Sequence, residues 1–236
     1  MALSLLSSSS AGTGEVVRLD LALSARQLRL FSVRVRRWKR VLDVLLAAVS
    51  ALLALPLGLL IALAIKLESR GPVFFSHQRI GKGQTPFRLW KFRTMAVNGD
   101  DILRQHLEEN PERILEWRQA RKLRGDPRVT RVGAILRRTS LDELPQLWNV
   151  LRGEMSLVGP RPIVEDEIGK YGDAFAFYCR ALPGITGLWQ VSGRNELSYG
   201  QRVALDLRYI RAWSFALDLA ILCKTIGAVV SGRGAY

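Results

Sequence analysis

An uncharged apolar run, Val44–Ile65, constrains the fold of this chain more than any other feature (VLLAAVSALLALPLGLLIALAI). At about 1.5 Å of helical rise per residue the run reaches about 33 Å, enough to cross the ~30 Å hydrocarbon core of a bilayer. Pro56 lies near its middle, where a proline removes a backbone hydrogen bond and bends a helix. The run therefore predicts a membrane helix that either spans the bilayer or enters it and turns back.

Basic residues flank this run on both sides. Those before it are Arg34, Arg36, Arg37, Lys39 and Arg40, and those after it are Lys66 and Arg70. Lysine and arginine collect on the cytoplasmic side of bacterial membranes. A helix that bends at Pro56 and returns leaves both flanks on that side, so the pattern favours a re-entrant helix. A single span stays open, because many spanning helices tolerate a proline.

The charge balance predicts a polyanionic partner. The 236 residues carry 35 basic and 21 acidic side chains, a net charge of +14, which suits nucleic acid, anionic lipid headgroups or phosphorylated substrates. The two cysteines, Cys179 and Cys223, form no CxxC motif and indicate no disulfide framework. His77 and His106 lie far apart in the sequence, so we expect any metal to be Mg²⁺ or Mn²⁺ on oxygen ligands.

The sequence divides into three predicted segments. Residues 1–33 contain a serine run and are expected to be disordered. Residues 34–70 form the basic-flanked re-entrant membrane helix, and residues 71–236 form one cytosolic domain. The length allows one sizeable domain with an appendage of this kind.

The cytosolic part reads as mainly α with a small β-hairpin. The hairpin comprises VFFSHQRI (73–80) and TPFRLWKFRTM (85–95), which Gly81–Gln84 joins as a turn. Residues 100–123 then predict a helix that is broken at Asn110–Pro111, and residues 131–138 predict a short basic helix.

Adjacent carboxylates, Asp142 and Glu143, follow at what reads as a helix start. Ser140 is placed to cap that helix, with Glu143 three residues later as its capping-box partner, and Gly153 to end it. This interpretation is purely structural. However, N–H groups at a helix N-terminus also favour the ionised carboxylate that nucleophilic attack or metal binding requires. The pair is therefore a candidate catalytic site as well.

Basic side chains near this pair are candidate phosphate ligands. Arg137 precedes Asp142 by five residues and can turn back over the same helix start. Arg161 stands between two prolines, which preset its guanidinium for bidentate phosphate binding; the alternative is an ordinary exposed loop arginine. Lys91, on the second hairpin strand, is either a solvated strand end or part of the site.

Two further segments carry open alternatives. The glycine-rich stretch 183–195 contains Trp189, for which a core role is favoured over stacking on a ligand, and Arg194, which could bind an anionic group. The apolar stretch 215–230 can pack in the core or lie against a membrane surface.

Together these segments resemble the bacterial sugar transferases, a family of monotopic polyprenyl-phosphate phosphoglycosyl transferases. The matching pieces, in order, are the apolar helix around Pro56, Lys91–Met95, Asp126–Thr130, the long block Thr139–Pro162, and Pro183–Gly187 with Arg194. The resemblance covers about residues 37–236. The closing residues and the compact size look like the exopolysaccharide-initiating branch, whose larger relatives carry added transmembrane helices.

The resemblance implies a chemistry. A UDP-sugar binds with Mg²⁺, and the Asp142 carboxylate attacks the sugar-proximal phosphate and expels UMP. Undecaprenyl phosphate then takes the sugar phosphate. The resemblance to the exopolysaccharide branch implies galactose or glucose as the sugar. Glu143 would hold the metal with Asp142. Arg137 and Arg161 would bind phosphate oxygens, with Lys91 and Arg194 supporting the site. The expected place is the cytoplasmic face of the bacterial inner membrane, at the first step of exopolysaccharide repeat-unit assembly.

One position departs from the family pattern, and two other classes compete with this function. The family's re-entrant helix usually has a Ser-Pro pair at its bend, whereas Leu55 precedes Pro56 here. The net charge also fits a membrane-tethered nucleic-acid-binding protein or a scaffold protein without catalysis. Against nucleic acid, the chain shows no recognisable binding motif and its basic residues are dispersed.

Overall fold

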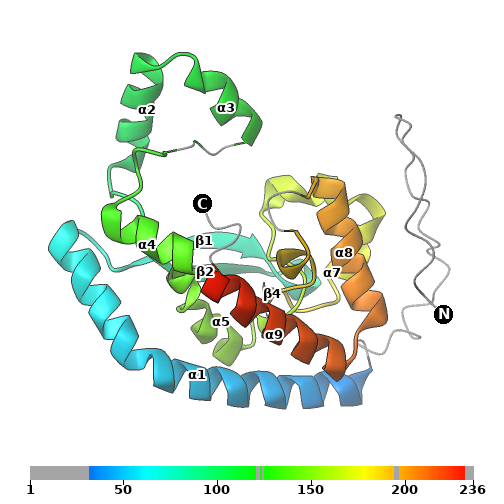
Figure 1. The fold of residues 1–236 in the computed structure, drawn as a ribbon. Helices are drawn as coiled ribbons and strands as arrows, with labels where there is room; N and C mark the ends of the chain where they lie inside the picture. Colours follow the sequence, from blue (N-terminus) through cyan, green and yellow to red (C-terminus); the bar gives the residue numbers. More distant parts are fainter. Residues whose placement is uncertain (1–31, 121–122, 124, 194–196, 232–236) are drawn as a thin grey trace.

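The computed structural model describes residues 32–120, 123, 125–193 and 197–231 (Figure 1). The expected disorder of residues 1–33 therefore lies almost wholly outside the described residues. The helices are α1 Val33–Glu68, α2 Gly99–Glu109, α3 Arg113–Ala120, α4 Arg131–Thr139, α5 Gln146–Arg152, α6 Ile168–Tyr171, α7 Phe175–Tyr178, α8 Tyr199–Ala212 and α9 Phe215–Ser231. The strands are β1 Phe74–Ile80, β2 Pro86–Phe92, β3 Ser156–Val158 and β4 Gly184–Thr186.

The expected mainly α fold with a β-hairpin is confirmed. Strands β1 and β2 pair antiparallel, with Phe75 opposite Lys91 and Arg79 opposite Phe87. A short 3₁₀ turn joins them, in which Gly83 takes a positive φ of 68°, a conformation that glycine adopts at little cost. A parallel pair that the sequence did not predict, β3 with β4, brings residue 156 beside residue 184.

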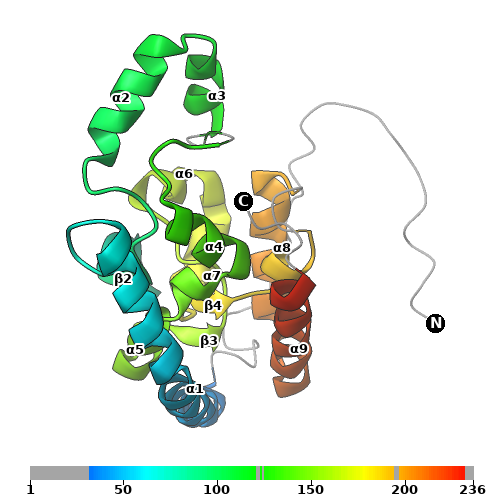
Figure 2. The same ribbon diagram turned by 60° about the vertical axis from the view of Figure 1, so that its left-hand side comes forward.

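The helix break at Asn110–Pro111 is also confirmed. Helix α2 ends at Glu109 and α3 begins at Arg113. Both helices stand away from the rest of the molecule in the two views (Figures 1 and 2). The rest of the helices and strands lie below them in both views.

Helix α1 is long and apolar enough to cross a membrane, but it lies along the body. It runs unbroken for 36 residues with Pro56 inside. Only 11% of its most apolar window is buried, so it is not the core helix of a globular protein. In Figure 1 it follows the lower edge of the body and changes direction part-way along. Its outward side is a row of exposed leucines that suits contact with lipid: Leu45, Leu46, Leu52, Leu53, Leu59, Leu60 and Leu63.

In the part of the chain that the structure describes, three clusters of buried side chains hold the body together. The largest joins α7, α8 and α9, with Tyr178, Ile210 and Ile221 at its centre. The other two fasten α1: Ala47 packs with Val150 and Met155, and Ile61 and Ile65 pack with Phe92 and Leu136. Both halves of α1 are thus attached to the same body.

The structure bears on the two segments for which the sequence left alternatives open, the one that contains Trp189 and residues 215–230. Trp189 is buried, with the Arg202 guanidinium 4.9 Å from the centre of its ring, so the core role is confirmed. For helix α9 the core alternative is confirmed, and contact with a membrane surface stays a prediction. It packs Ile221 into the core while leaving Leu219 and Ile226 exposed.

Candidate active site

The acidic pair sits on a tight turn between α4 and α5. Ser140 ends α4 in the left-handed region, with φ 56°, which is uncommon for a residue with a β-carbon. Asp142 and Glu143 follow in the single 3₁₀ turn Leu141–Glu143, and α5 begins only at Gln146.

The predicted capping box is therefore wrong. The Ser140 side chain makes no cap hydrogen bond, because its left-handed backbone continues the chain into a turn rather than into a helix. The Glu143 side chain is consequently not used as a cap. Gly153, in contrast, does end α5, with φ 86°, as the sequence predicted.

Lys91 bridges the two carboxylates. Its ammonium group donates to Asp142 Oδ2 at 3.2 Å and to Glu143 Oε1 at 2.7 Å. Asp142 is 7% exposed. The sequence alternative of a solvated strand end is thus wrong for Lys91, whose side chain points from β2 into the acidic turn.

The charges of this cluster shift the pKa values of its members. Burial raises the pKa of Asp142, and the neighbouring Glu143 carboxylate adds to this, whereas Lys91 and Arg137 oppose it. Burial lowers the pKa of Lys91, but the Glu143 and Asp142 carboxylates outweigh burial and raise it above its usual value. Lys91 and Arg137 favour the ionised form of Asp142 but do not outweigh burial, so the pKa of Asp142 stays above its usual value.

Arg137 reaches the same cluster from α4. Its Nε donates to Thr94 Oγ1 at 2.9 Å, and its charge acts on Asp142. Helix α4 can approach this closely because residue 133 is glycine: a β-carbon there would collide with the Thr94 carbonyl oxygen. The expected turn of Arg137 back over the acidic pair is consistent with this geometry.

Arg161 lies in a second, adjoining cluster. Its guanidinium donates to Glu167 at 3.2 Å, and Arg79 on β1 forms a longer ion pair with the same carboxylate, at 3.9 Å. Burial lowers the pKa of Arg79 most, Arg161 lowers it further, and Glu167 and Glu143 raise it. Arg79 therefore interacts electrostatically both with Arg161 and with Glu143 of the acidic pair.

Arg79 and Glu167 were missed by the sequence analysis. Arg79 is a lone arginine in an alternating strand, and Glu167 is one of several acids in EDE. The only available signal was the hairpin register, which places Arg79 and Lys91 on the same face of the two strands.

Asp206, a fully buried carboxyl on α8, lies near the Arg161 loop. It accepts a hydrogen bond from the Tyr171 hydroxyl at 2.8 Å, and the nearby backbone N–H and charge of Arg161 lower its pKa. Burial raises its pKa to about 7. A carboxyl that titrates near neutral pH thus lies close to the loop that carries Arg161.

Replacing Asp206 with asparagine is expected to change the pH dependence of stability. The unfolded carboxyl has a pKa of about 3.9, so between this value and about 7 the folded chain binds more protons. Stability from this group is complete below the lower value and is lost as pH rises, by about 1.4 kcal/mol per pH unit. Asp206→Asn keeps an acceptor for Tyr171 and cannot ionise.

The melting temperature of Asp206→Asn relative to wild type should therefore be higher at pH 8 than at pH 5. Thermal unfolding followed by intrinsic fluorescence in detergent measures both values. Other carboxyls titrate equally in the two proteins and cancel in the difference. The same difference at both pH values would contradict the assigned pKa.

The carboxylates fit a magnesium ion that arrives with phosphates. Asp142 Oδ1 and Glu143 Oε2 make no hydrogen bond or ion pair with any residue that the structure describes. The described part of the chain holds no cluster of three or more metal-binding side chains. Mg²⁺ is commonly bound by one or two carboxylates plus substrate phosphates and water, so two free carboxylate oxygens suffice.

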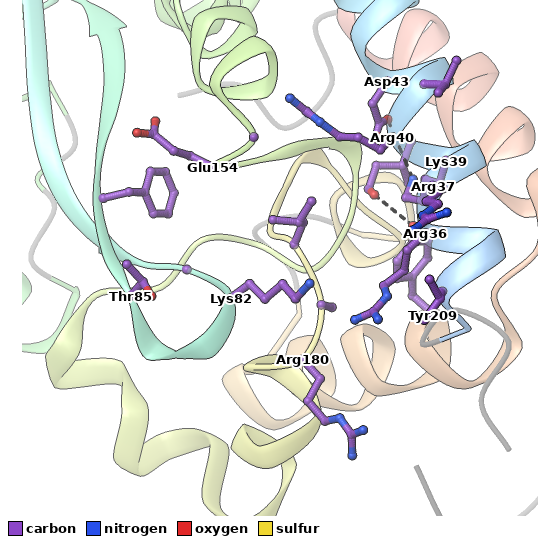
Figure 3. Close-up of a pocket in the computed structure, with 18 residues that line it drawn as sticks. Arg36, Arg37, Lys39, Arg40, Asp43, Lys82, Thr85, Glu154, Arg180 and Tyr209 are labelled. Atoms are coloured by element: carbon purple, nitrogen blue, oxygen red, sulfur yellow. Dashed lines mark hydrogen bonds and ion pairs between the residues drawn. The ribbon is translucent and has the colours of Figure 1, made fainter. Parts of the chain in front are cut away.

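The remaining candidate residue and a basic cavity lie elsewhere. Arg194 falls outside the described residues. A cavity of about 860 Å³ opens between α1 and the β1–β2 turn, and its walls include none of the acidic-site residues (Figure 3). The candidate site is therefore the cluster of Lys91, Asp142 and Glu143 with Arg137, flanked by Arg161.

Comparison with known proteins identifies the family. The model of the family described as "Bacterial sugar transferase" matches residues 34–232. The chain belongs to the bacterial sugar transferase family. It is 54% identical over 198 residues to exopolysaccharide production protein ExoY of Rhizobium meliloti (strain 1021), covering 84% of this chain and 88% of that relative. The enzyme class expected from the sequence, a polyprenyl-phosphate phosphoglycosyl transferase, is confirmed at the level of the family.

Two further relatives carry more detailed names. The UDP-glucose:undecaprenyl-phosphate glucose-1-phosphate transferase of Caulobacter vibrioides is 46% identical over 207 residues, 84% of this chain and 72% of the relative. The undecaprenyl-phosphate galactose phosphotransferase of Salmonella typhimurium is 45% identical over 198 residues, 84% of this chain and 41% of the relative. The names differ in the sugar. Family membership favours an enzyme over a nucleic-acid-binding or scaffold protein.

Proposed function

We propose that the chain transfers a hexose 1-phosphate from a UDP-sugar to undecaprenyl phosphate and releases UMP. The observation that carries this proposal is the buried Asp142 carboxylate beside Glu143, with Lys91 and Arg137 as its counter-charges. The names of the relatives supply the lipid and the choice between galactose and glucose. The reaction would begin exopolysaccharide assembly, in keeping with the similarity to ExoY.

The proposed reaction has two displacements at one phosphorus atom. An Asp142 carboxylate oxygen attacks the phosphorus that bears the sugar, and the bond to the bridging oxygen breaks, so that UMP leaves with the electron pair. An oxygen of undecaprenyl phosphate then attacks the same phosphorus. The bond to the Asp142 oxygen breaks, which restores the carboxylate and gives the lipid diphosphate sugar. Two steps allow a soluble donor and a lipid acceptor to bind in turn.

The cationic side chains stabilise the charge that develops during both steps. Phosphoryl transfer depends chiefly on positioning and on charge neutralisation. Arg137 already faces Asp142, and Arg161 is held by Glu167 at the adjoining loop. Bound Mg²⁺ would supply further neutralisation of the diphosphate, with Asp142 and Glu143 as its protein ligands. Lys91 keeps the two carboxylates together before substrate binds.

Release of UMP across a panel of UDP-sugars tests this function. Purified enzyme with undecaprenyl phosphate and Mg²⁺ should release UMP with UDP-galactose or UDP-glucose. Without the lipid acceptor, a phosphohexose adduct should form on the peptide that contains Asp142, detected by mass spectrometry. No UMP release with any UDP-sugar would refute the activity. Full turnover without any adduct or partial exchange would refute the two-step mechanism.

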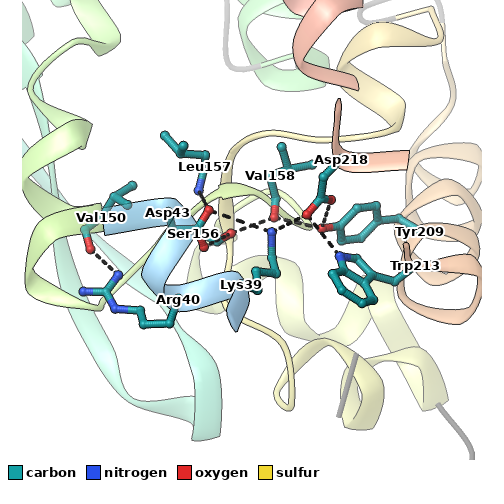
Figure 4. A network of polar contacts seen from close by, with 10 residues as sticks. All are labelled: Lys39, Arg40, Asp43, Val150, Ser156, Leu157, Val158, Tyr209, Trp213 and Asp218. Carbon is teal, nitrogen blue, oxygen red and sulfur yellow. Dashed lines mark hydrogen bonds and ion pairs between the residues drawn. The ribbon is translucent and has the colours of Figure 1, made fainter. Parts of the chain in front are cut away.

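We further propose that α1 is re-entrant, with its bend at Pro56, and that the body lies on the cytoplasmic face of the inner membrane. Near the N-terminal end of α1, Lys39 pairs with Asp218 at 2.6 Å, and Arg40 donates to the Val150 carbonyl oxygen (Figure 4). At the other end, Arg93 donates to the carbonyl oxygens of residues 69 and 70. A spanning helix separates its ends by the bilayer, so attachment of both ends to one body supports the re-entrant form.

Cysteine labelling is expected to place both ends of α1 on one side. In a Cys223→Ser background, Arg34→Cys and Arg70→Cys each add an exposed thiol at one flank. An impermeant maleimide should label neither in intact spheroplasts and both after the membrane is opened. Labelling of one flank from outside would show a spanning helix and refute the proposed topology.

A further inference from the structure

The cavity between α1 and the β1–β2 turn is strongly basic. Among the described residues, its walls carry six basic side chains against two acidic ones. The basic ones are Arg36, Arg37, Lys39, Arg40, Lys82 and Arg180. The cavity is separate from the acidic pair: the length of β2 from Pro86 to Lys91, roughly 16 Å at 3.3 Å per residue, lies between them.

Several of these charges are already satisfied. Lys39 pairs with Asp218, and Arg40 donates to the last carbonyl oxygens of α5, those of residues 150 and 151. The two acids also have partners, because Asp43 accepts from Ser156 and Glu154 accepts from Asn149. These groups leave little negative charge for the rest of the cavity.

Arg36, Arg37 and Lys82, in contrast, make no side-chain hydrogen bond or ion pair with any described residue. Lys82 extends from the turn toward α1, and Arg36 extends from α1 toward Lys82 (Figure 3). The pKa of Lys82 is lowered by partial removal from water and then by the positive charge of Arg36. Like charges converge here without a counter-ion from the described chain.

The remaining walls are apolar and close to the membrane helix. Val33, Val41 and Phe87 line the cavity beside the cations, and Val41 stands three residues before the apolar run Val44–Ile65. A ligand here meets positive charge and apolar surface together, at the point where α1 begins its membrane segment. A phosphate carried on acyl chains has these two properties, whereas a free phosphate has only the first.

We propose that this cavity binds the phosphate-bearing headgroup of an anionic phospholipid, with Arg36 and Lys82 as its chief ligands. The site would fix the N-terminal half of α1 at headgroup depth, apart from the catalytic cluster. It does not depend on the proposed function.

Titration with phosphatidylglycerol tests this site. Native mass spectrometry of the full chain in a zwitterionic detergent measures the affinity of the first bound lipid, with phosphatidylcholine, whose headgroup has no net charge, as the comparison. Each cation near a membrane surface contributes about 1 kcal/mol, so Arg36→Gln with Lys82→Gln should weaken binding about thirtyfold. Both side chains are exposed, and a melting temperature equal to that of the wild type checks that the double variant is folded.

A matched pair outside the cavity provides the control. Arg34 lies on the same helix, Arg88 lies on the same hairpin, and neither lines the cavity. Arg34→Gln with Arg88→Gln removes the same charge and should leave the affinity unchanged. Equal loss in both double variants would reduce the site to diffuse attraction and overturn it. Displacement of the lipid by excess inorganic phosphate would overturn the lipid as occupant and show a soluble anion site.

Discussion

Asp142→Asn is expected to lower UMP release by at least about a thousandfold, because loss of a covalent nucleophile removes the reaction path itself. The amide is close in size to the carboxylate and can still accept from Lys91, which holds Asp142 at 3.2 Å. The fold should therefore survive. Initial rates of UMP release with the UDP-sugar that the wild-type enzyme prefers measure the effect.

A second measurement separates the nucleophile from its neighbours. Wild-type enzyme without lipid acceptor should exchange labelled UMP into the UDP-sugar, because the first step is reversible, and Asp142→Asn should not. Asp166→Asn is the matched control: Asp166 is an exposed aspartate that also lies in a single 3₁₀ turn, Glu165–Glu167. Exchange that persists in Asp142→Asn while turnover is lost would assign the nucleophile to another residue.

Local signals in the sequence were sufficient for most of the elements around this site. The two β-rich runs within residues 73–95, joined by the turn Gly81–Gln84, predicted the antiparallel hairpin that the structure shows. Asn110–Pro111 and Gly153 marked helix ends because proline and glycine act through their own backbone. Such signals need no knowledge of the tertiary fold.

The error at Ser140 shows where local reasoning fails. Ser-x-x-Glu is a capping pattern only if the first residue has extended backbone angles. Ser140 instead takes a left-handed conformation between α4 and the 3₁₀ turn. The Glu143 side chain, which would complete the capping box, instead accepts a hydrogen bond from Lys91, 52 residues away. A capping rule considers only four consecutive residues, so it cannot detect a contact between residues this far apart in the sequence.

The supporting residues were missed for the same reason. The three residues interact with Arg161 but come from different elements. They are Arg79 of β1, Glu167 of a short turn and Asp206 of α8. Arg161 itself was recognised because its two flanking prolines are a local feature. The sequence thus indicated the chemical groups, while the tertiary fold decided which charges hold them.

A buried polar network fastens the start of α1 to the body. Lys39 donates to Asp218 at 2.6 Å and lies 3.9 Å from Asp43. Asp218 also accepts from the Tyr209 hydroxyl and the Trp213 indole, at 2.8 and 3.1 Å (Figure 4). Lys39 is thus the cation for two carboxylates on different elements, and it is 11% exposed.

Lys39→Met is expected to destabilise the protein by about 3 kcal/mol, the lower end of the range for breaking a buried ion pair, because Tyr209 and Trp213 still stabilise Asp218. For a chain of this size the melting temperature should fall by about 6–12 °C. Arg104→Met is the control, since Arg104 also pairs with an aspartate at 2.6 Å but is 71% exposed. Its melting temperature should change by about 2 °C or less.

Equal ion-pair lengths with unequal burial make this comparison decisive. If pair length set the effect, the two variants would lose the same stability; if burial sets it, only Lys39→Met loses much. Adding Asp218→Asn to Lys39→Met removes the uncompensated charge and should recover part of the loss, because neutral replacement of both partners costs less than loss of one. A double variant less stable than Lys39→Met would show that Asp218 acts through its bonds to Tyr209 and Trp213, and not as the counter-charge that holds α1.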